Sequence, residues 1–298
     1  MSQFGLLGLG NMEEIEDTNI TSEDLLRTGT PAKADFLIVH YVRLLTDGTQ
    51  GAPLSFVDCL GLYSVFLLLK PDRILLHANS KDNSEALLNK TLNWSIVQTI
   101  LAPLQRTING KTISYIAHEA DIRKLRALEE YGGIVLDFDV VILNGSTVRA
   151  LWTITPCFIC WEPARNSANS GFLGCRQKNA TYPRSILKQY EVAYNPNCWS
   201  CNSGFVPWNI WNDNKDIAVL ADNVCNNPDF YQRDKINEQR GKYGWNLERQ
   251  AGLSLFPSRQ GFQPDQRQPL ELSFGGCLPL APDGRSPRPD GATDSPCS

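Results

Sequence analysis

Apolar and polar residues in the middle of the chain change from a helical to a strand-like pattern. Between His118 and Tyr131, apolar side chains recur at three-residue steps with charged residues between them, which predicts a helix. Gly132 and Gly133 follow, as glycines commonly do past the end of a helix. The next residues, Ile134–Leu136, begin a buried strand that is interrupted by Asp-Phe-Asp and resumes at Val140–Leu143.

An earlier stretch of the chain predicts the start of a parallel sheet. Asp35–Leu44 has the pattern of a buried strand, Leu54–Leu69 has that of a helix, and Arg73–His77 that of a second strand. The helix ends before Pro71, as the restriction on residues before proline favours. Strand, helix and strand in this order predict an α/β fold, in which ligands bind beyond the carboxyl ends of the strands.

Two carboxylates, Asp137 and Asp139, interrupt the second apolar run. A buried charge is costly unless it is paired or bound to a cation. On a regular strand, residues two apart point to the same side, so the pair suits a hard divalent ion such as Mn²⁺ or Mg²⁺. Such ions accept one or two carboxylates together with phosphate oxygens of a substrate. The alternative is a polar turn in which both side chains are solvated.

Composition narrows the range of functions. The 298 residues are 42% hydrophobic and 20% charged, which is typical of a globular protein. A net charge of −4 without a basic stripe argues against nucleic acid as a partner. The longest apolar run, Leu60–Leu69, is too short to be a transmembrane segment. We expect one domain at residues 33–252, between a flexible polar segment at 1–32 and a disordered, Pro/Gly-rich tail at 253–298.

Cysteines occur in two C-x-x-C pairs, Cys157 with Cys160 and Cys198 with Cys201. Two such pairs can form a four-thiolate zinc site. The spacing between these two pairs is longer than in a usual zinc ribbon, so disulfides or free core cysteines are the favoured interpretation, and zinc remains the alternative.

The central block, with Asp121 at the start of its helix and YGGIVLDFDV at its end, resembles the DXD block of the family 32 glycosyltransferases. Three other segments are similar to parts of the same family: Phe36–Leu44, Leu54–His77 and Ser170–Tyr190. The resemblance implies a glycosyltransferase type A fold, with a Rossmann-like mixed sheet and flanking helices. It also implies a UDP- or GDP-sugar donor, a glycan or glycolipid acceptor, retention of configuration and residence in the Golgi lumen.

The resemblance also implies roles for particular residues. Asp137 and Asp139 are the expected metal ligands, with Mn²⁺ or Mg²⁺ as cofactor. The residues expected to bind the donor are Asp121, Arg123, Lys124, Gly132, Gly133 and Asp137. Family members usually carry Arg where this chain has Lys124, so either the adjacent Arg123 substitutes for it or donor binding is weaker. Simpler roles are charge complementarity with the helix dipole for Asp121 and helix termination for the glycines.

A stretch rich in Trp, Asn and Gly, Asn195–Trp211, suits a surface that binds a sugar acceptor. The alternative is a loop closed by cysteines and packed on the core.

Two other functions fit part of the pattern. In a phosphatase of the haloacid dehalogenase type, Asp137 would be the nucleophile and Asp139 the acid/base. A catalytically inactive relative of the glycosyltransferases is the second alternative, because the family's late histidine segment has no counterpart after His118. No signal sequence or membrane anchor is recognisable in the chain, so a cytoplasmic location is the alternative to the Golgi lumen.

Overall fold

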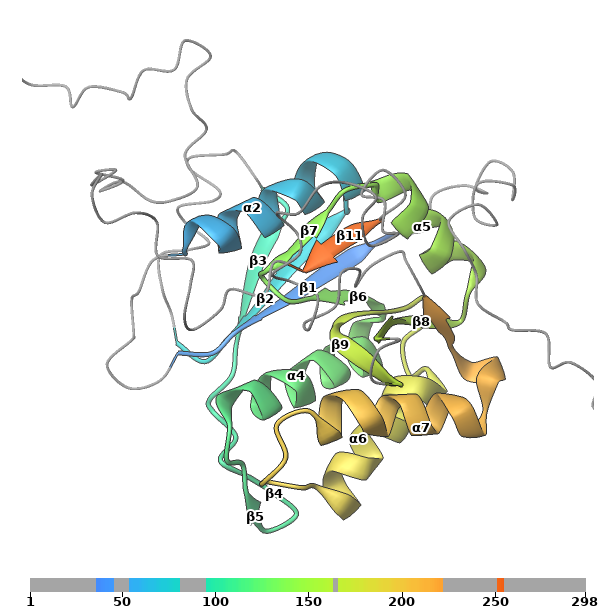
Figure 1. The fold of residues 1–298 in the computed structure, drawn as a ribbon. Helices are drawn as coiled ribbons and strands as arrows, with labels where there is room; N and C mark the ends of the chain where they lie inside the picture. Colours follow the sequence, from blue (N-terminus) through green and yellow to red (C-terminus); the bar gives the residue numbers. More distant parts are fainter. Residues whose placement is uncertain (1–35, 46–53, 81–94, 163–165, 222–250, 255–298) are drawn as a thin grey trace, which may run out of the picture.

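A seven-stranded mixed sheet forms the centre of the computed structural model (Figure 1). The structure describes residues 36–45, 54–80, 95–162, 166–221 and 251–254. The strand order is β10-β8-β9-β6-β1-β2-β3. The strands of this sheet are β1 (Ile38–Arg43), β2 (Arg73–Ala78), β3 (Val97–Leu101), β6 (Gly133–Leu136), β8 (Cys157–Glu162), β9 (Ser167–Cys175) and β10 (Val219–Ala221).

Strand direction in this sheet is parallel except around β9. β1 pairs in parallel with β2 and with β6, β2 with β3, and β10 with β8, whereas β9 runs antiparallel to both β6 and β8. The carboxyl end of β6 therefore lies beside the middle of β9, with Leu136 opposite Phe172. This register decides which residues of β9 face the end of β6.

Helices cover both faces of the sheet (Figure 1). One face carries α2 (Phe56–Ser64), the π-helical turn η1 (Val65–Leu69), α5 (Gly145–Ile154) and the small antiparallel sheet of β7 (Val140–Ile142) and β11 (Gly252–Ser254). The other face carries α4 (Ile116–Tyr131), α6 (Thr181–Ala193), the π-helical turn η3 (Cys201–Phe205) and α7 (Val206–Asp213). Three short elements complete the described chain: β4 (Thr107–Ile108), β5 (Lys111–Thr112) and the 3-10 helix η4 (Lys215–Ile217).

The buried residues of β6 show how one strand serves two cores. Ile134 and Leu136 belong to the cluster under α2 and α5, whereas Val135 belongs to the cluster under α4 and α6. Alternate side chains of a strand point to opposite faces. A strand buried on both faces is continuously apolar, which is why this stretch contains no polar residue before Asp137.

The fold class predicted from the sequence is confirmed: the structure is a mixed α/β sheet with flanking helices. The predicted helix that ends before Pro71 begins at Phe56, where Ser55 and Asp58 form a capping box, and finishes as η1. The expected segment 1–32 and most of the tail lie outside the described residues. The expected domain boundary at residue 252 falls inside β11, a strand that pairs with β7. No helix in the described part of the chain is long and apolar enough to cross a bilayer.

Disulfides, rather than zinc, account for the two C-x-x-C pairs. Cys157 is bonded to Cys175 across β8 and β9, and Cys198 is bonded to Cys201 within one turn. Cys160 is disulfide-bonded as well. The four-thiolate zinc alternative is therefore wrong, since these thiols are used in covalent bonds.

Two buried histidines connect β1, β2 and the start of β6. His40 Nε2 lies 2.7 Å from the Gly132 carbonyl oxygen, which can only accept, so this nitrogen donates. His40 Nδ1 must then accept from His77 Nε2, 3.0 Å away. Burial, and then the neighbouring His77, lower the pKa of His40 to about 3. Burial, and then the Arg123 guanidinium, lower the pKa of His77 to about 4. Both rings are therefore neutral at pH 7.

These lowered pKa values predict acid sensitivity. A histidine with a lower pKa in the folded state stabilises the fold above its unfolded pKa of 6.5 and loses this contribution as the pH falls towards 4. Between these limits, we expect the free energy of unfolding to fall by up to about 1.4 kcal/mol per pH unit for each histidine. Urea unfolding of wild type and His77→Gln at several pH values measures this. The variant should show a shallower slope, and equal slopes would contradict the interpretation.

Candidate functional site

The Asp-Phe-Asp segment forms a turn at the carboxyl end of β6. β6 ends at Leu136, and the next peptide N–H, from Asp137, donates to the Gly171 carbonyl of β9 at 2.8 Å. Val140 N–H then donates to the Asp137 carbonyl at 3.0 Å, which closes the turn before β7. Phe138 packs against Tyr41, with ring centroids 4.8 Å apart. The expectation that both aspartates lie on one regular strand is thus wrong, because the chain turns between the two sheets.

Lys124 joins two of the predicted site residues. Its Nζ lies 2.6 Å from Asp137 Oδ1 and 2.9 Å from Asp121 Oδ1, so one ammonium bridges the helix α4 and the end of β6. Lys124 and Asp121 are buried, whereas the side chain of Asp137 is 44% exposed. Burial alone would lower the pKa of Lys124, but the two carboxylates outweigh it and hold this pKa above its ordinary value. The lysine is therefore a permanent cation at the site.

Asp121 is held from three directions. Besides Lys124, it accepts from the Tyr190 hydroxyl at 3.4 Å and from the Ser170 hydroxyl at 3.5 Å. Burial, and then the Asp121 carboxylate, raise the pKa of Tyr190 well above its ordinary value, so its hydroxyl stays protonated and donates. These contacts account for a buried carboxylate more fully than the helix dipole does.

Gly171 packs closely against the second carboxylate oxygen of Asp137. A Cβ added at Gly171 would lie 2.5 Å from Asp137 Oδ2 and 2.8 Å from Asn169 Oδ1, closer than real side chains come. Both oxygens therefore lie against the backbone of Gly171, and a side chain at this position would displace them. Asn169 is fixed there, because its amide nitrogen donates to Glu162 at 3.1 Å and its oxygen accepts from Gly171 N–H at 2.8 Å.

The oxygen atoms at this turn are compatible with a divalent cation that also binds a phosphate. Asp137 Oδ2 lies beside Gly171, and Asp139 lies two residues further along the partly exposed turn. Within the described residues, no group of three or more His, Cys, Asp or Glu side chains is placed to hold a metal. Mg²⁺ and Mn²⁺ sites of nucleotide enzymes often use one or two carboxylates, with the remaining positions filled by water and substrate.

Arg123 lies away from the two aspartates of the turn. Its guanidinium is 2.8 Å from Glu119 Oε1 and donates to backbone carbonyls at the ends of β2 and β3, including Ala102 at 3.0 Å and Pro103. The structure therefore places Lys124, and not Arg123, against Asp137. Arg123 holds the carboxyl ends of two strands against α4.

The two glycines have a structural role at the junction of α4 and β6. Gly132 ends α4 with φ of +70°, and Gly133 begins β6 with φ of +95°. A Cβ on Gly133 would lie 2.3 Å from the Ile38 carbonyl oxygen, so the close approach is to β1 and not to a ligand. Both stand at the amino end of β6, opposite to Asp137. Helix termination and backbone packing account for both glycines, and the prediction that they bind the donor stays a prediction without support from these contacts.

Four residues of the site were not identified individually from the sequence: Asn169, Ser170, Gly171 and Tyr190. The segment that contains three of them, Ser170–Tyr190, was recognised only as similar to a later part of the family. Their place beside Asp121 and Asp137 depends on the antiparallel register of β9 against β6 and on the packing of α6 against α4. No local pattern in the sequence encodes that register.

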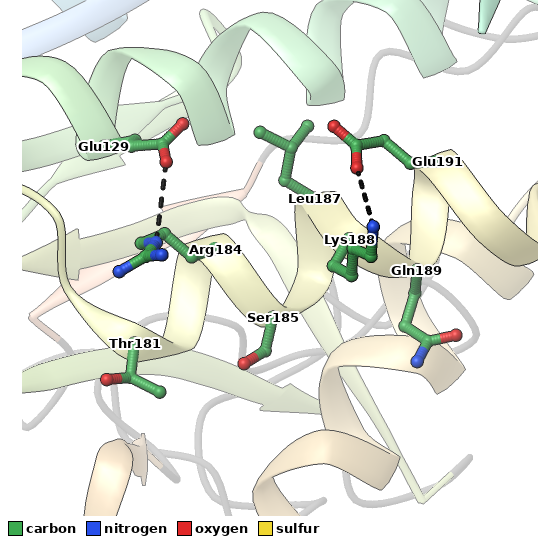
Figure 2. Close-up of a pocket in the computed structure, with 8 residues that line it drawn as sticks. All are labelled: Glu129, Thr181, Arg184, Ser185, Leu187, Lys188, Gln189 and Glu191. Carbon is green, nitrogen blue, oxygen red and sulfur yellow. Dashed lines mark hydrogen bonds and ion pairs between the residues drawn. The ribbon is translucent and has the colours of Figure 1, made fainter. Parts of the chain in front are cut away.

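A separate surface pocket of about 540 Å³ lies on α6 (Figure 2). Its lining comes from α6 and from Glu129 of α4, and it contains none of the predicted site residues. The ion pairs shown there, Arg184 with Glu129 and Lys188 with Glu191, join side chains that are mostly exposed. Such pairs contribute little to stability. We assign no function to this pocket.

Comparison with known proteins gives distant likenesses to glycosyltransferases. The chain is 24% identical over 208 residues to "Glucan organizing enzyme 1" of Cryptococcus neoformans var. grubii. That match covers 64% of this chain and 55% of the relative, so the chain spans about half the length of the curated protein it matches. No protein-family profile matches the sequence.

Solved structures with a similar arrangement include three glycosyltransferases. The PaToxG glycosyltransferase has a TM-score of 0.44 and 13% identity, over 65% of this chain and 74% of its own. The galactosyltransferase LgtC, in complex with donor and acceptor sugar analogs, has a TM-score of 0.42 and 13% identity, over 73% of this chain and 86% of its own. GlyE of Streptococcus pneumoniae has a TM-score of 0.46 and 10% identity, over 76% of this chain and 56% of its own. These scores are too low to establish a shared function, and the resemblance to family 32 stays a prediction.

The bridge made by Lys124 predicts a strong and specific effect on stability. Lys124→Met leaves the buried Asp121 without its cation, so we expect the free energy of unfolding to fall by about 3 kcal/mol. The double variant with Asp121→Asn should lose less than the sum of the two single changes, as urea denaturation would show. Lys188→Met is the matched control, since its exposed pair with Glu191 should contribute less than about 1 kcal/mol. Strict additivity of the two single changes would contradict the bridge.

The close packing of Gly171 against Asp137 predicts that an added methyl group damages the site. Gly171→Ala places a Cβ against Asp137 Oδ2 and displaces this carboxylate, so we expect the variant to fold but to lose most of its affinity for a Mn²⁺–nucleotide pair, measured by calorimetry. Gly204→Ala is the control, because the nearest atom to its Cβ would be 3.3 Å away, on Ala168. Unchanged nucleotide affinity in Gly171→Ala would show that the position of the Asp137 carboxylate does not matter for a ligand.

Proposed function

We propose that this chain is a divalent-cation-dependent glycosyltransferase of family 32, which transfers a sugar from a UDP- or GDP-sugar to a hydroxyl of a glycan or glycolipid. Retention of anomeric configuration is part of this proposal, since the family resemblance implies it. The arrangement of Asp121, Lys124 and Asp137 at the carboxyl end of β6, with Gly171 packed against Asp137, is the observation that supports it most strongly.

The chemistry of this arrangement suits a diphosphate. The site lies after the carboxyl end of β6, where ligands of open α/β sheets usually bind. It combines a permanent cation, Lys124, with a partly exposed carboxylate turn. When bound by Asp137 and Asp139, Mn²⁺ or Mg²⁺ would supply charge neutralisation to the donor's diphosphate and to the nucleoside diphosphate that leaves.

The residues of this chain would position the donor. An ammonium carries three N–H donors, and Asp121 and Asp137 account for two of those of Lys124. We assign the third to a phosphate oxygen of the donor. Asp121, fixed by Ser170 and Tyr190, would keep this ammonium from turning away when the carboxylate of Asp137 turns to a cation.

The distant relative supports the same class of function. The 24% identity to "Glucan organizing enzyme 1" extends over 208 residues, which is longer than the DXD block alone. We also propose the Golgi lumen, rather than the cytoplasm, as the location. The disulfides Cys157–Cys175 and Cys198–Cys201 support this, because such bonds persist in oxidising compartments.

Calorimetric titration of UDP and GDP, each with and without Mn²⁺, tests the donor site. We expect one of the two nucleotides to bind wild type with a strong requirement for Mn²⁺. Asp137→Asn and Asp139→Asn should each weaken this binding by at least about tenfold, because each removes a charged ligand. Asp213→Asn, at an exposed position on α7, is the control and should bind as wild type does. Absence of binding by either nucleotide to folded wild type would refute the proposal.

Two activity measurements separate the alternatives. Hydrolysis of p-nitrophenyl phosphate that depends on Asp137 would favour the phosphatase, and the proposed transferase should show none. Binding of a nucleotide with Mn²⁺, but no hydrolysis or transfer from any UDP- or GDP-hexose, would identify an inactive relative.

A further inference from the structure

An exposed tryptophan near the candidate site is held in place by the core beneath it. In the Asn195–Trp211 stretch, Trp199 is 56% exposed, whereas Trp211 is buried. Its carbonyl oxygen accepts from Nε2 of the fully buried His118 at 3.0 Å. The Cys198–Cys201 disulfide closes the turn on which it stands. The alternative of a loop closed by cysteines and packed on the core holds for Trp211, whereas the sugar-binding interpretation of the Asn195–Trp211 stretch stays a prediction.

Tyr115 limits the freedom of the Trp199 ring. The two rings meet edge to face, with centroids 5.1 Å apart and an angle of 79°. The His118 ring lies below both, 4.9 Å from Tyr115 and 6.2 Å from Trp199. An aromatic side chain that is already ordered loses little conformational entropy when a ligand binds, so its contact contributes more to affinity.

This aromatic pair is connected to the donor site through buried residues. The Tyr194 hydroxyl lies 2.7 Å from His118 Nδ1, and the Tyr194 ring stacks on Tyr190, which donates to Asp121. His118 and Lys124 are six residues apart on α4, which is about 9 Å along the helix axis. The helix α4 therefore carries residues of both the donor site and the support of the aromatic pair, less than two turns apart.

We propose that Trp199, with Tyr115 beside it, binds a pyranose ring of the acceptor glycan. The axial C–H groups of a pyranose carry a partial positive charge, and the face of an aromatic ring carries a negative one, so the two surfaces attract. The exposed amide side chains of Asn195 and Asn197 stand on the same turn and would serve the sugar's hydroxyl groups. A pyranose whose hydroxyl groups are all equatorial, as in β-linked glucose, presents axial C–H groups without hydroxyl groups between them on either face. The identity of this sugar as the acceptor rests on the proposed function, but binding of a pyranose by Trp199 does not.

Saturation-transfer NMR with four disaccharides tests this site: cellobiose, laminaribiose, lactose and α-1,6-mannobiose. We expect at least one of the three β-linked sugars to bind wild type, with transfer strongest to its axial protons. Trp199→Ala should weaken this binding by roughly tenfold, and Tyr115→Ala by less, whereas Trp199→Phe should retain part of it. Ile154→Ala is the control, since it removes an exposed apolar side chain from α5, on the opposite face of the sheet.

Calorimetry of UDP and GDP with Mn²⁺ on the same samples separates this inference from the proposed function. Sugar binding lost in Trp199→Ala with nucleotide binding unchanged supports an acceptor site. Sugar binding without any nucleotide binding would refute the transferase and leave Trp199 as a sugar-binding residue. The inference is overturned if none of the four sugars binds folded wild type, if Trp199→Ala binds them equally, or if this variant loses nucleotide and sugar together.

Discussion

The salt bridge between Lys124 and two aspartates determines how the candidate site is built. An isolated buried charge is too costly to persist, so Asp121 and Lys124 can be buried only as partners. Once paired, they place one ammonium at the end of β6, where it meets Asp137. The partly exposed carboxylate thus has a fixed partner on its inner side and faces solvent on the other. Every other residue of the site is arranged around this bridge.

The sheet explains why the bridge forms at this place. α4 and β6 are consecutive and antiparallel, joined by two glycines with positive φ, so the amino-terminal half of the helix lies beside the carboxyl end of the strand. Arg123 and the two buried histidines hold the same helix and its following turn against β1, β2 and β3. β9 completes the surroundings from the other side, because its antiparallel register brings Gly171 next to Asp137.

How much of this could be predicted from the sequence depends on whether a residue acts locally. The helix, the glycine stop and the strand lie in one continuous segment, and their periodicity and composition predicted them well, whereas the turn at the two aspartates was expected as part of a regular strand. The pairing of Cys157 with Cys175 and the position of Asn169 to Gly171 beside Asp137 depend on strand register. This register is set by contacts between segments far apart in the chain. The glycine pair was assigned to ligand binding because glycine permits both close approach and helix termination, and the sequence does not say which neighbour approaches. In the structure the neighbours are the backbone of Arg176–Lys178 for Gly132 and the Ile38 carbonyl for Gly133.

The bridge has a consequence for how the sequence of this site can vary. Because Lys124 contacts Asp121 and Asp137 at once, a change of charge at any one of the three positions leaves a partner unpaired. A substitution tolerated at one of them therefore depends on the residues at the other two, so that the three positions are expected to vary together among related sequences.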